Sequence, residues 1–282
     1  MKVPAPAIGP PAVSIGTWTR TSMKRLHEVK PIWHALIWIT AYIVLVNVGD
    51  GLSELVGRPK AATIPLLVVL AVALLLYLRR YGWLGRYGLR PLSRQDFRST
   101  LLYAPLLVVA ALPWLLNEVR DDLDRTAVLL VCGLMVCVGF IEELLFRGLL
   151  FKAVLRRGTL RRAVLIAGVT FGIGHVVNLA RGYTGREQIL QIGVAVALGI
   201  VLTLLFAVTG TIVPLIVFHL LYNIGGSVTA GTPGSELALV VVTVVISAGY
   251  ALYLVGVLRR SGSTETPGTA VRAEPLGARG RG

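Results

Sequence analysis

Two adjacent carboxylates, Glu142 and Glu143, interrupt a run that is otherwise apolar, VLLVCGLMVCVGFIEELLFRGLLF, at positions 128–151. Arg147 follows Glu143 at the i,i+4 spacing that lets a carboxylate and a guanidinium pair on one helix face. On insertion scales, one charge at the centre of a bilayer costs about 2.5–3.5 kcal/mol. Ionisable residues in such a segment are therefore a functional-site hypothesis, in which Glu143 and Arg147 would form a supporting ion pair.

Two later apolar segments each carry a histidine and an asparagine. His175 closes the sequence FGIGH and Asn178 follows it, while His219 and Asn223 stand i,i+4 in HLLYN. A helix rises about 1.5 Å per residue, so both histidines fall in the same middle slab of a core about 30 Å thick as Glu143. Three helices could therefore bring these groups to one buried polar site.

A carboxylate, two imidazoles and an amide in a confined pocket suit hydrolysis. Glu142 beside His175 could activate a water molecule for attack on a carbonyl carbon. His219 and Asn223 could donate hydrogen bonds to the oxyanion that develops. This combination predicts a hydrolase whose catalytic residues are Glu142, His175, His219 and Asn223.

A metal site is an alternative use of the same residues. Glu142, His175 and His219 would supply two imidazoles and one carboxylate, a ligand set that leaves a zinc ion one position for water. No HExxH motif is present, so the spacing alone does not require a metal. The cofactor stays open between none and a divalent metal such as zinc.

The elements that position these residues are predicted to be membrane helices. The 282 residues are 55% hydrophobic and 15% charged, where a soluble domain has about 25% charged residues. Spanning a bilayer as a helix takes about 20 apolar residues, and eight blocks approach that length. They lie at about 32–48, 62–78, 99–116, 126–150, 162–181, 188–208, 211–230 and 236–258. We predict an all-α polytopic bundle of eight spans, or seven if the break at Thr209-Gly210 does not separate two helices.

The net charge is +14, and the basic residues responsible for it are concentrated in the segments on one side of the predicted membrane helices. With a cytoplasmic N-terminus, 21 Lys and Arg fall in inside segments and 6 in outside loops. This bias is the positive-inside pattern, which predicts a multi-pass protein with both termini in the cytoplasm. Basic inner segments favour contact with anionic lipids, and no nucleic-acid motif accompanies them. We therefore expect membrane lipids as partners and no nucleic acid.

The predicted organisation has five parts. Residues 1–30 form a basic leader without an apolar stretch that would indicate a cleaved signal peptide. Residues 31–96 hold the first two membrane helices and a basic loop. The catalytic core covers 97–230, the last membrane helix 231–258, and 259–282 is a polar tail predicted to be disordered. His27 in the leader and His34 near the first span are not assigned to the site.

Three motifs carry a family resemblance. EELLFR, FGIGH and HLLYN fit EExxxR, FxxxH and HxxxN, in this order and on late membrane spans. Over about residues 97–230 the chain resembles the CPBP family, which joins the type II CAAX prenyl proteases with the Abi group of bacteriocin-processing and immunity proteins. The resemblance implies an eight-helix intramembrane endopeptidase with a cavity open to the cytosol.

The resemblance also implies roles for the motif residues. Glu142 and His175 would activate water, His219 and Asn223 would form the oxyanion hole, and Glu143 with Arg147 would support them. The expected partner is a membrane-bound peptide or protein, either prenylated CAAX-type or bacteriocin-like. The sequence determines neither the substrate nor the oligomeric state.

Two other functions compete with the protease. A non-catalytic membrane scaffold or a bacteriocin self-immunity protein would use the pocket for binding alone. A proton- or ion-coupled transporter would use the buried carboxylates directly. The chain lacks an internal sequence repeat, which disfavours the transporter.

Overall fold

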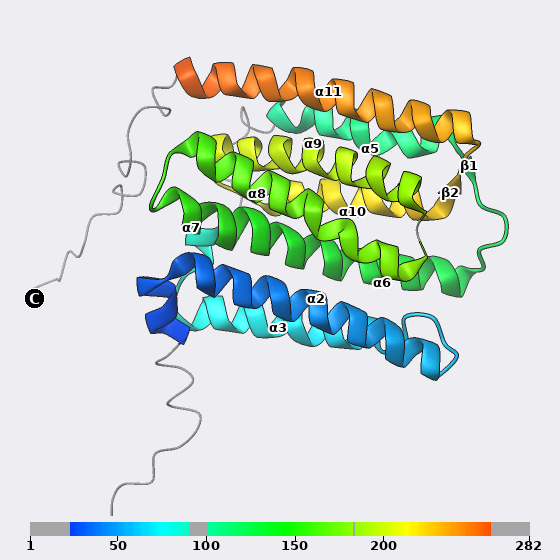
Figure 1. Cartoon of the computed structure of the whole chain (residues 1–282), viewed down its shortest axis with the longest axis horizontal. Helices are drawn as coiled ribbons and strands as arrows, with labels where there is room; N and C mark the ends of the chain where they lie inside the picture. The colour runs from blue at the N-terminus through cyan, green and yellow to red at the C-terminus, as the bar shows by residue number, and fades with distance from the viewer. Residues whose placement is uncertain (1–22, 91–100, 183, 261–282) are drawn as a thin grey trace, which may run out of the picture.

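The structure of the chain is a computed structural model that describes residues 23–90, 101–182 and 184–260. The first 22 residues of the predicted leader lie outside the described residues. So does the predicted disordered tail beyond residue 260. Figure 1 shows the described part as long helices that run side by side along one axis.

Six helical stretches in the described part are long and apolar enough to cross a membrane, and two shorter apolar ones complete the bundle. The long stretches are α2 (Pro31–Leu55), α3 (Thr63–Arg80), α6 (Arg125–Glu142) continued by η4 (Glu143–Leu150) and α7 (Phe151–Leu155), α8 (Leu160–Gly174) continued by η5 (His175–Arg181), α9 (Gly185–Thr209) and α11 (Pro233–Arg260). The shorter ones are η3 (Leu101–Tyr103) with α5 (Ala104–Leu116), and α10 (Val213–Val228). The predicted all-α polytopic bundle is confirmed.

Successive helices alternate in direction, so the connections gather at two ends of the bundle (Figure 1). One end holds the α2–α3, α5–α6, α8–α9 and α10–α11 connections. We call it the strand end, because β1 (Glu118–Val119) and β2 (Thr229–Ala230) pair there as antiparallel strands. The other, which we call the terminal end, holds the α7–α8 and α9–α10 connections, η1 (Gly85–Tyr87) and residues 23 and 260.

Local capping explains where the helices begin. Asp124 accepts a hydrogen bond from the backbone of Ala127 at 2.7 Å and starts α6. Thr159 caps α8 in the same way, and Thr184 forms a capping box with Glu187 at the start of α9. These side chains satisfy amide groups that the first helical turn leaves without partners.

Gly210 decides between seven and eight helices. It adopts a left-handed conformation with φ 69° and ends α9, a conformation that glycine reaches without steric cost. Ile212 then donates its backbone N–H to the carbonyl of Gly88 at 3.1 Å, and α10 begins at Val213. The sixth and seventh apolar blocks are therefore separate helices.

Glycines set the approach of the helices that carry the site. A Cβ atom on Gly172 of α8 would lie 2.7 Å from the backbone nitrogen of Val196 on α9. One on Gly199 would lie 2.6 Å from the carbonyl oxygen of Gly168. Small residues of this kind let membrane helices pack backbone to backbone. This packing fixes the end of α8, where His175 lies, against α9.

Candidate active site

The two carboxylates lie where the fourth membrane helix changes its winding. The α-helical part ends at Glu142, and Glu143 begins a π-helical segment that runs to Leu150. Every residue from 141 to 151 is buried. Segments of π-helix occur mostly as short insertions and are frequent at functional sites. Here the change falls between the two adjacent glutamates.

Glu143 forms the centre of a buried ion pair. Its Oε1 accepts a hydrogen bond from Nη1 of Arg147 at 2.8 Å, and both side chains are fully buried. The same oxygen lies 2.9 Å from Nδ1 of His219 on α10. The guanidinium of Arg147 also stacks over the ring of Phe171, 4.2 Å from its centroid. Glu143 therefore orients the imidazole of His219, while Arg147 holds Glu143.

Glu142 contacts the other nitrogen of the same imidazole. Its Oε2 lies 3.4 Å from Nε2 of His219, and its Oε1 accepts a hydrogen bond from the hydroxyl of Tyr42 at 2.7 Å. The five side chains form a continuous row, which we call the polar chain: Tyr42, Glu142, His219, Glu143 and Arg147. It joins α2, the fourth membrane helix and α10. In this geometry Glu142 pairs with His219, whereas the sequence placed it beside His175.

His175 lies at the junction of α8 and η5 and is half-buried. Its Nδ1 lies 3.1 Å from the backbone carbonyl oxygen of Phe171. A carbonyl oxygen only accepts, so Nδ1 is the protonated nitrogen, and Nε2 of the neutral ring is left as an acceptor. His175 therefore offers a lone pair without belonging to the polar chain.

The two asparagines differ in their surroundings. Asn223 lies one turn after His219 and is half-buried, with its side chain in the cavities described next. Asn178 is buried and donates to the side-chain oxygen of Gln191 at 2.9 Å. Asn223 lines both of these cavities, whereas Asn178 lines only the one that also contains Glu142.

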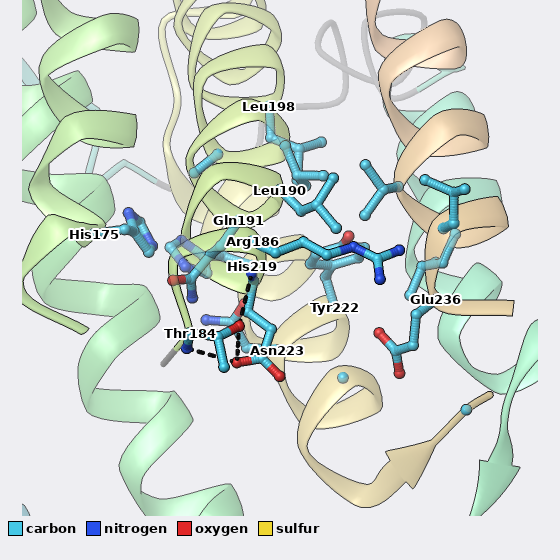
Figure 2. A pocket seen from close by; sticks show the side chains of 18 of the residues that line it. His175, Thr184, Arg186, Leu190, Gln191, Leu198, His219, Tyr222, Asn223 and Glu236 are labelled. Atoms are coloured by element: carbon cyan, nitrogen blue, oxygen red, sulfur yellow. Dashed lines mark hydrogen bonds between the residues drawn. The ribbon is translucent and has the colours of Figure 1, made fainter. Parts of the chain in front are cut away.

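Two cavities meet at this site. The first, which we call the Glu142 cavity, has a volume of about 540 Å³ and includes Tyr42 and Glu142 in its wall. The second, which we call the His219 cavity, has a volume of about 890 Å³ and lies between α9, α10 and α11 (Figure 2). The residues that line both are Phe171, His175, Gln191, Tyr222, Asn223 and Gly226. A ligand that crosses from one cavity to the other therefore passes His175 and Asn223.

The predicted metal ligands are divided in this arrangement. Among residues 23–90, 101–182 and 184–260, no three His, Cys, Asp or Glu side chains are grouped so that they could hold a metal ion. Glu142 and His219 face each other, while His175 bonds to the carbonyl of Phe171. In this arrangement the three residues do not fit a three-ligand site.

The sequence interpretation missed Tyr42, Gln191 and Tyr222. Tyr42 lies in the first membrane helix, 100 positions before its partner Glu142, in a stretch where a tyrosine has no distinguishing neighbour. Tyr222 stands inside the motif HLLYN, and its place between His219 and Asn223 could have drawn attention to it. Gln191 is a polar residue in an apolar block, and this could have identified it as a candidate site residue.

Comparison with known proteins identifies the middle of the chain. Residues 124–225 match the family model described as Type II CAAX prenyl endopeptidase Rce1-like. No curated protein and no solved structure matches the chain significantly. The family match confirms the resemblance that the three motifs predicted. It begins at the residue that caps α6 and ends just after Asn223, so Tyr42 lies outside it.

Proposed function

We propose that this chain, with its Rce1-like type II CAAX prenyl endopeptidase segment, is an intramembrane endopeptidase that cleaves membrane-associated peptides or proteins by an activated water molecule. The observation that carries the proposal is the polar chain, which ends at two cavities lined by His175 and Asn223. Placing charged side chains inside a membrane costs free energy, and such residues are usually retained for a function. Prenylated CAAX-type and bacteriocin-like peptides are the substrate classes that the family resemblance indicates.

In the proposed reaction Glu142 is the general base. Glu142 and His175 both line the Glu142 cavity, and Nε2 of His175 is left as an acceptor, so we assign the reacting water molecule to this cavity, where both side chains can bind it. Glu142 takes one proton from this water as the oxygen attacks the carbonyl carbon of the peptide. The protonated Glu142 then gives this proton to the departing amine nitrogen, which leaves a carboxylic acid and a new amino terminus.

The developing oxyanion is assigned to Asn223 and His219. Both lie on one face of α10, and both line the His219 cavity. Nδ1 of His219 donates to Glu143, so Nε2 carries an N–H only when the ring is an imidazolium. In that form the N–H, whose contact of 3.4 Å with Glu142 is long for a hydrogen bond, can turn to the oxyanion. Donors that already point at the oxyanion supply a large share of the rate in acyl transfer.

Tyr42 and Glu143 support these groups from either end of the polar chain. The hydroxyl of Tyr42 fixes the rotamer of Glu142, and Glu143 fixes the ring of His219 through Nδ1. This division resembles the way in which a buried carboxylate orients the histidine of a catalytic triad. We assign both as positioning residues.

Cleavage of a quenched fluorescent membrane-peptide library by the purified protein tests the proposal. We expect the wild type to cleave, Glu142→Gln to be inactive, and a strong chelator to leave the wild type active. Loss of activity with the chelator would instead move the chemistry to a metal. Binding of peptides without cleavage by the wild type would support a scaffold or self-immunity protein.

A further inference from the structure

We propose that the passage between the two cavities is a subsite for an extended stretch of peptide backbone, bound by the side-chain amide of Gln191 and given room by Gly226. The inference deepens the proposed function and rests on it for the identity of the ligand as a peptide. Both residues line both cavities. Neither belongs to the three motifs, and neither takes part in the reaction steps assigned above.

The carbonyl group that reacts has to lie in this passage. The water molecule is assigned to the Glu142 cavity, whereas the oxyanion donors His219 and Asn223 line the His219 cavity. A carbonyl carbon can be attacked from the first cavity, with its oxygen stabilised from the second, only where the two cavities meet. The backbone next to the cleaved bond therefore runs along the residues that the cavities share.

Gln191 presents an oriented hydrogen-bond donor at this place. It lies near the start of α9 and is half-buried. Asn178 donates through Nδ2 to Oε1 of Gln191 at 2.9 Å, and Nε2 of Gln188 lies 3.5 Å from the same oxygen. The oxygen and nitrogen of an amide point in different directions from one carbon, so Nε2 of Gln191 is turned away from Asn178. In the part of the chain that the structure describes, this nitrogen has no acceptor.

A donor of this kind fits the carbonyl oxygen of a peptide bond. The amide nitrogen of glutamine carries two N–H groups, and a peptide carbonyl taken out of water costs free energy unless it accepts a hydrogen bond. Figure 2 shows Gln191 beside the same cavity as His175, His219 and Asn223. His219 and Asn223 are assigned to the oxyanion of the cleaved bond, so Gln191 is assigned to the carbonyl of a neighbouring residue.

Gly226 provides the space for the bound segment. It lies on α10, three residues after Asn223, and is exposed. A Cβ atom added to Gly226 would meet no atom within 4 Å, whereas one added to Gly225 would lie 2.7 Å from the indole nitrogen of Trp114. Gly225 is therefore required by helix packing and Gly226 is not. The missing side chain of Gly226 leaves the passage open.

The two residues contribute differently to substrate choice. A hydrogen bond to the main chain adds affinity whatever the sequence, while the space for side chains decides which residues fit. Gln191 should therefore increase the affinity for all peptides that enter the passage. Gly226 should set the size of the residue that is accepted next to the cleaved bond.

Peptide binding to the inactive Glu142→Gln protein tests the subsite without a cleavage assay. The probes are fluorescein-labelled peptides of the membrane-peptide library, and fluorescence anisotropy in detergent gives their dissociation constants. On this background Gln191→Met is compared with Gln188→Met, and Gly226→Leu with Gly249→Leu. Gln188 carries the same amide one turn earlier but lines neither cavity. Gly249 on α11 also has no atom within 4 Å of an added Cβ and lies outside both cavities.

We expect Gln191→Met to raise the dissociation constant about two- to tenfold, which is the effect of losing one neutral hydrogen bond. Gly226→Leu should raise it about tenfold or more, because its side chain fills the passage, at an unchanged melting temperature. The two control variants should bind as tightly as the Glu142→Gln protein itself. Equal effects within either pair, or no peptide binding to the Glu142→Gln protein, would overturn the subsite.

Steady-state cleavage by Gln191→Met with Glu142 intact separates a backbone contact from an oxyanion donor. KM should rise and kcat should stay near its wild-type value, because the contact is formed equally in the ground state and the transition state. A fall in kcat at constant KM would contradict this assignment. If the wild type binds peptides without cleaving them, the proposed function fails, while the binding comparison of the two pairs still decides the subsite.

Discussion

Two buried clusters in the described part of this molecule are built around histidines, and they differ in charge and in access to a cavity. At the terminal end, His27 and His34 lie among aromatic side chains. Nε2 of His27 is 2.5 Å from the hydroxyl of Tyr87, and Nε2 of His34 is 2.8 Å from that of Tyr77. The ring of His27 also packs on Trp83 at a centroid distance of 3.9 Å. We call this group the aromatic cluster.

The clusters differ in what the imidazoles meet. In the polar chain both nitrogens of His219 face carboxylates. His219 lines one cavity, and its neighbour Glu142 lines the other. In the aromatic cluster the side-chain partners of His27 and His34 are tyrosine hydroxyls and the indole N–H of Trp38, all uncharged, and neither histidine lines either cavity. Burial of a histidine therefore does not by itself indicate a catalytic role. Such a role also requires charged side chains that orient the ring and a cavity through which a ligand can reach it.

The largest expected effect comes from Glu142→Gln, which removes the proposed base while it keeps the size of the side chain. Positioned general bases contribute about 10²–10⁴-fold, so cleavage should fall by at least that factor. The melting temperature should change little, because Tyr42 can still donate to the amide oxygen. The same peptide-cleavage assay and a thermal unfolding scan in detergent measure the two effects. Retained cleavage would remove Glu142 from the mechanism.

Arg147→Met is expected to affect stability more than any change in the aromatic cluster. It leaves the carboxylate of Glu143 buried without its cation, and breaking a buried pair costs about 3–5 kcal/mol. The free energy of unfolding should therefore fall by that amount, as measured by chemical denaturation in detergent.

The control for this prediction is the double variant Glu143→Gln with Arg147→Met. It removes both charges, so it should recover part of the lost stability. It should not recover cleavage, because His219 then lacks the carboxylate that orients it. A double variant no more stable than Arg147→Met would show that the pair is not the source of the effect.

Tyr42→Phe sharpens the comparison, because Tyr77→Phe is a matched change in the aromatic cluster. Each removes one hydroxyl that bonds a titratable side chain, Glu142 in the first case and His34 in the second. Hydrogen bonds to charged groups contribute about 1.5–3 kcal/mol, so kcat should fall by about one order of magnitude or more in Tyr42→Phe. KM should stay near its wild-type value, because the hydroxyl acts through Glu142.

Steady-state kinetics of the two variants side by side measures this difference. Tyr77→Phe should keep the wild-type kcat. An equal loss in both variants would mean that Tyr42 serves only packing. A change in KM alone would place Tyr42 in substrate binding.

The membrane helices could be predicted from the sequence because hydropathy over about 20 residues is a local property. The predicted block at 62–78, for example, corresponds to α3 at 63–80, and that at 188–208 to α9 at 185–209. The question of seven or eight helices depended on the backbone at Gly210, where the left-handed conformation ends α9. A glycine permits that conformation without requiring it, so the sequence left both answers open.

The arrangement within the site was less predictable. The motifs identify Glu142, His175 and His219, but which of them meet depends on helix rotation. The π-helical segment that begins at Glu143 changes this rotation, and composition does not signal it. Tyr42 was missed because its contact with Glu142 joins helices far apart in sequence. His27 was placed in the basic leader without a role, yet it is 3% exposed, because Trp83 and Tyr87 from the segment after α3 pack against it.

The smallest expected effect belongs to the aromatic cluster and depends on pH. Burial, followed by His34, Arg156 and Arg86, lowers the pKa of His27 from 6.5 to about 4. Between these values the unfolded chain binds a proton that the folded chain does not, so this residue makes stability fall as pH drops from about 6.5 towards 4. Above pH 6.5 neither state is protonated, and the dependence disappears.

His27→Phe removes this titration and keeps a ring against Trp83. Its melting temperature should therefore fall less than that of the wild type between pH 7 and pH 5, when both are scanned in the same detergent. Peptide cleavage at pH 7 should be unaffected, because no group of the polar chain contacts His27. If the melting temperatures of the wild type and of His27→Phe fell equally between pH 7 and pH 5, His27 would not titrate in this range. A loss of cleavage at pH 7 would break the comparison itself, since it would tie the aromatic cluster to the site.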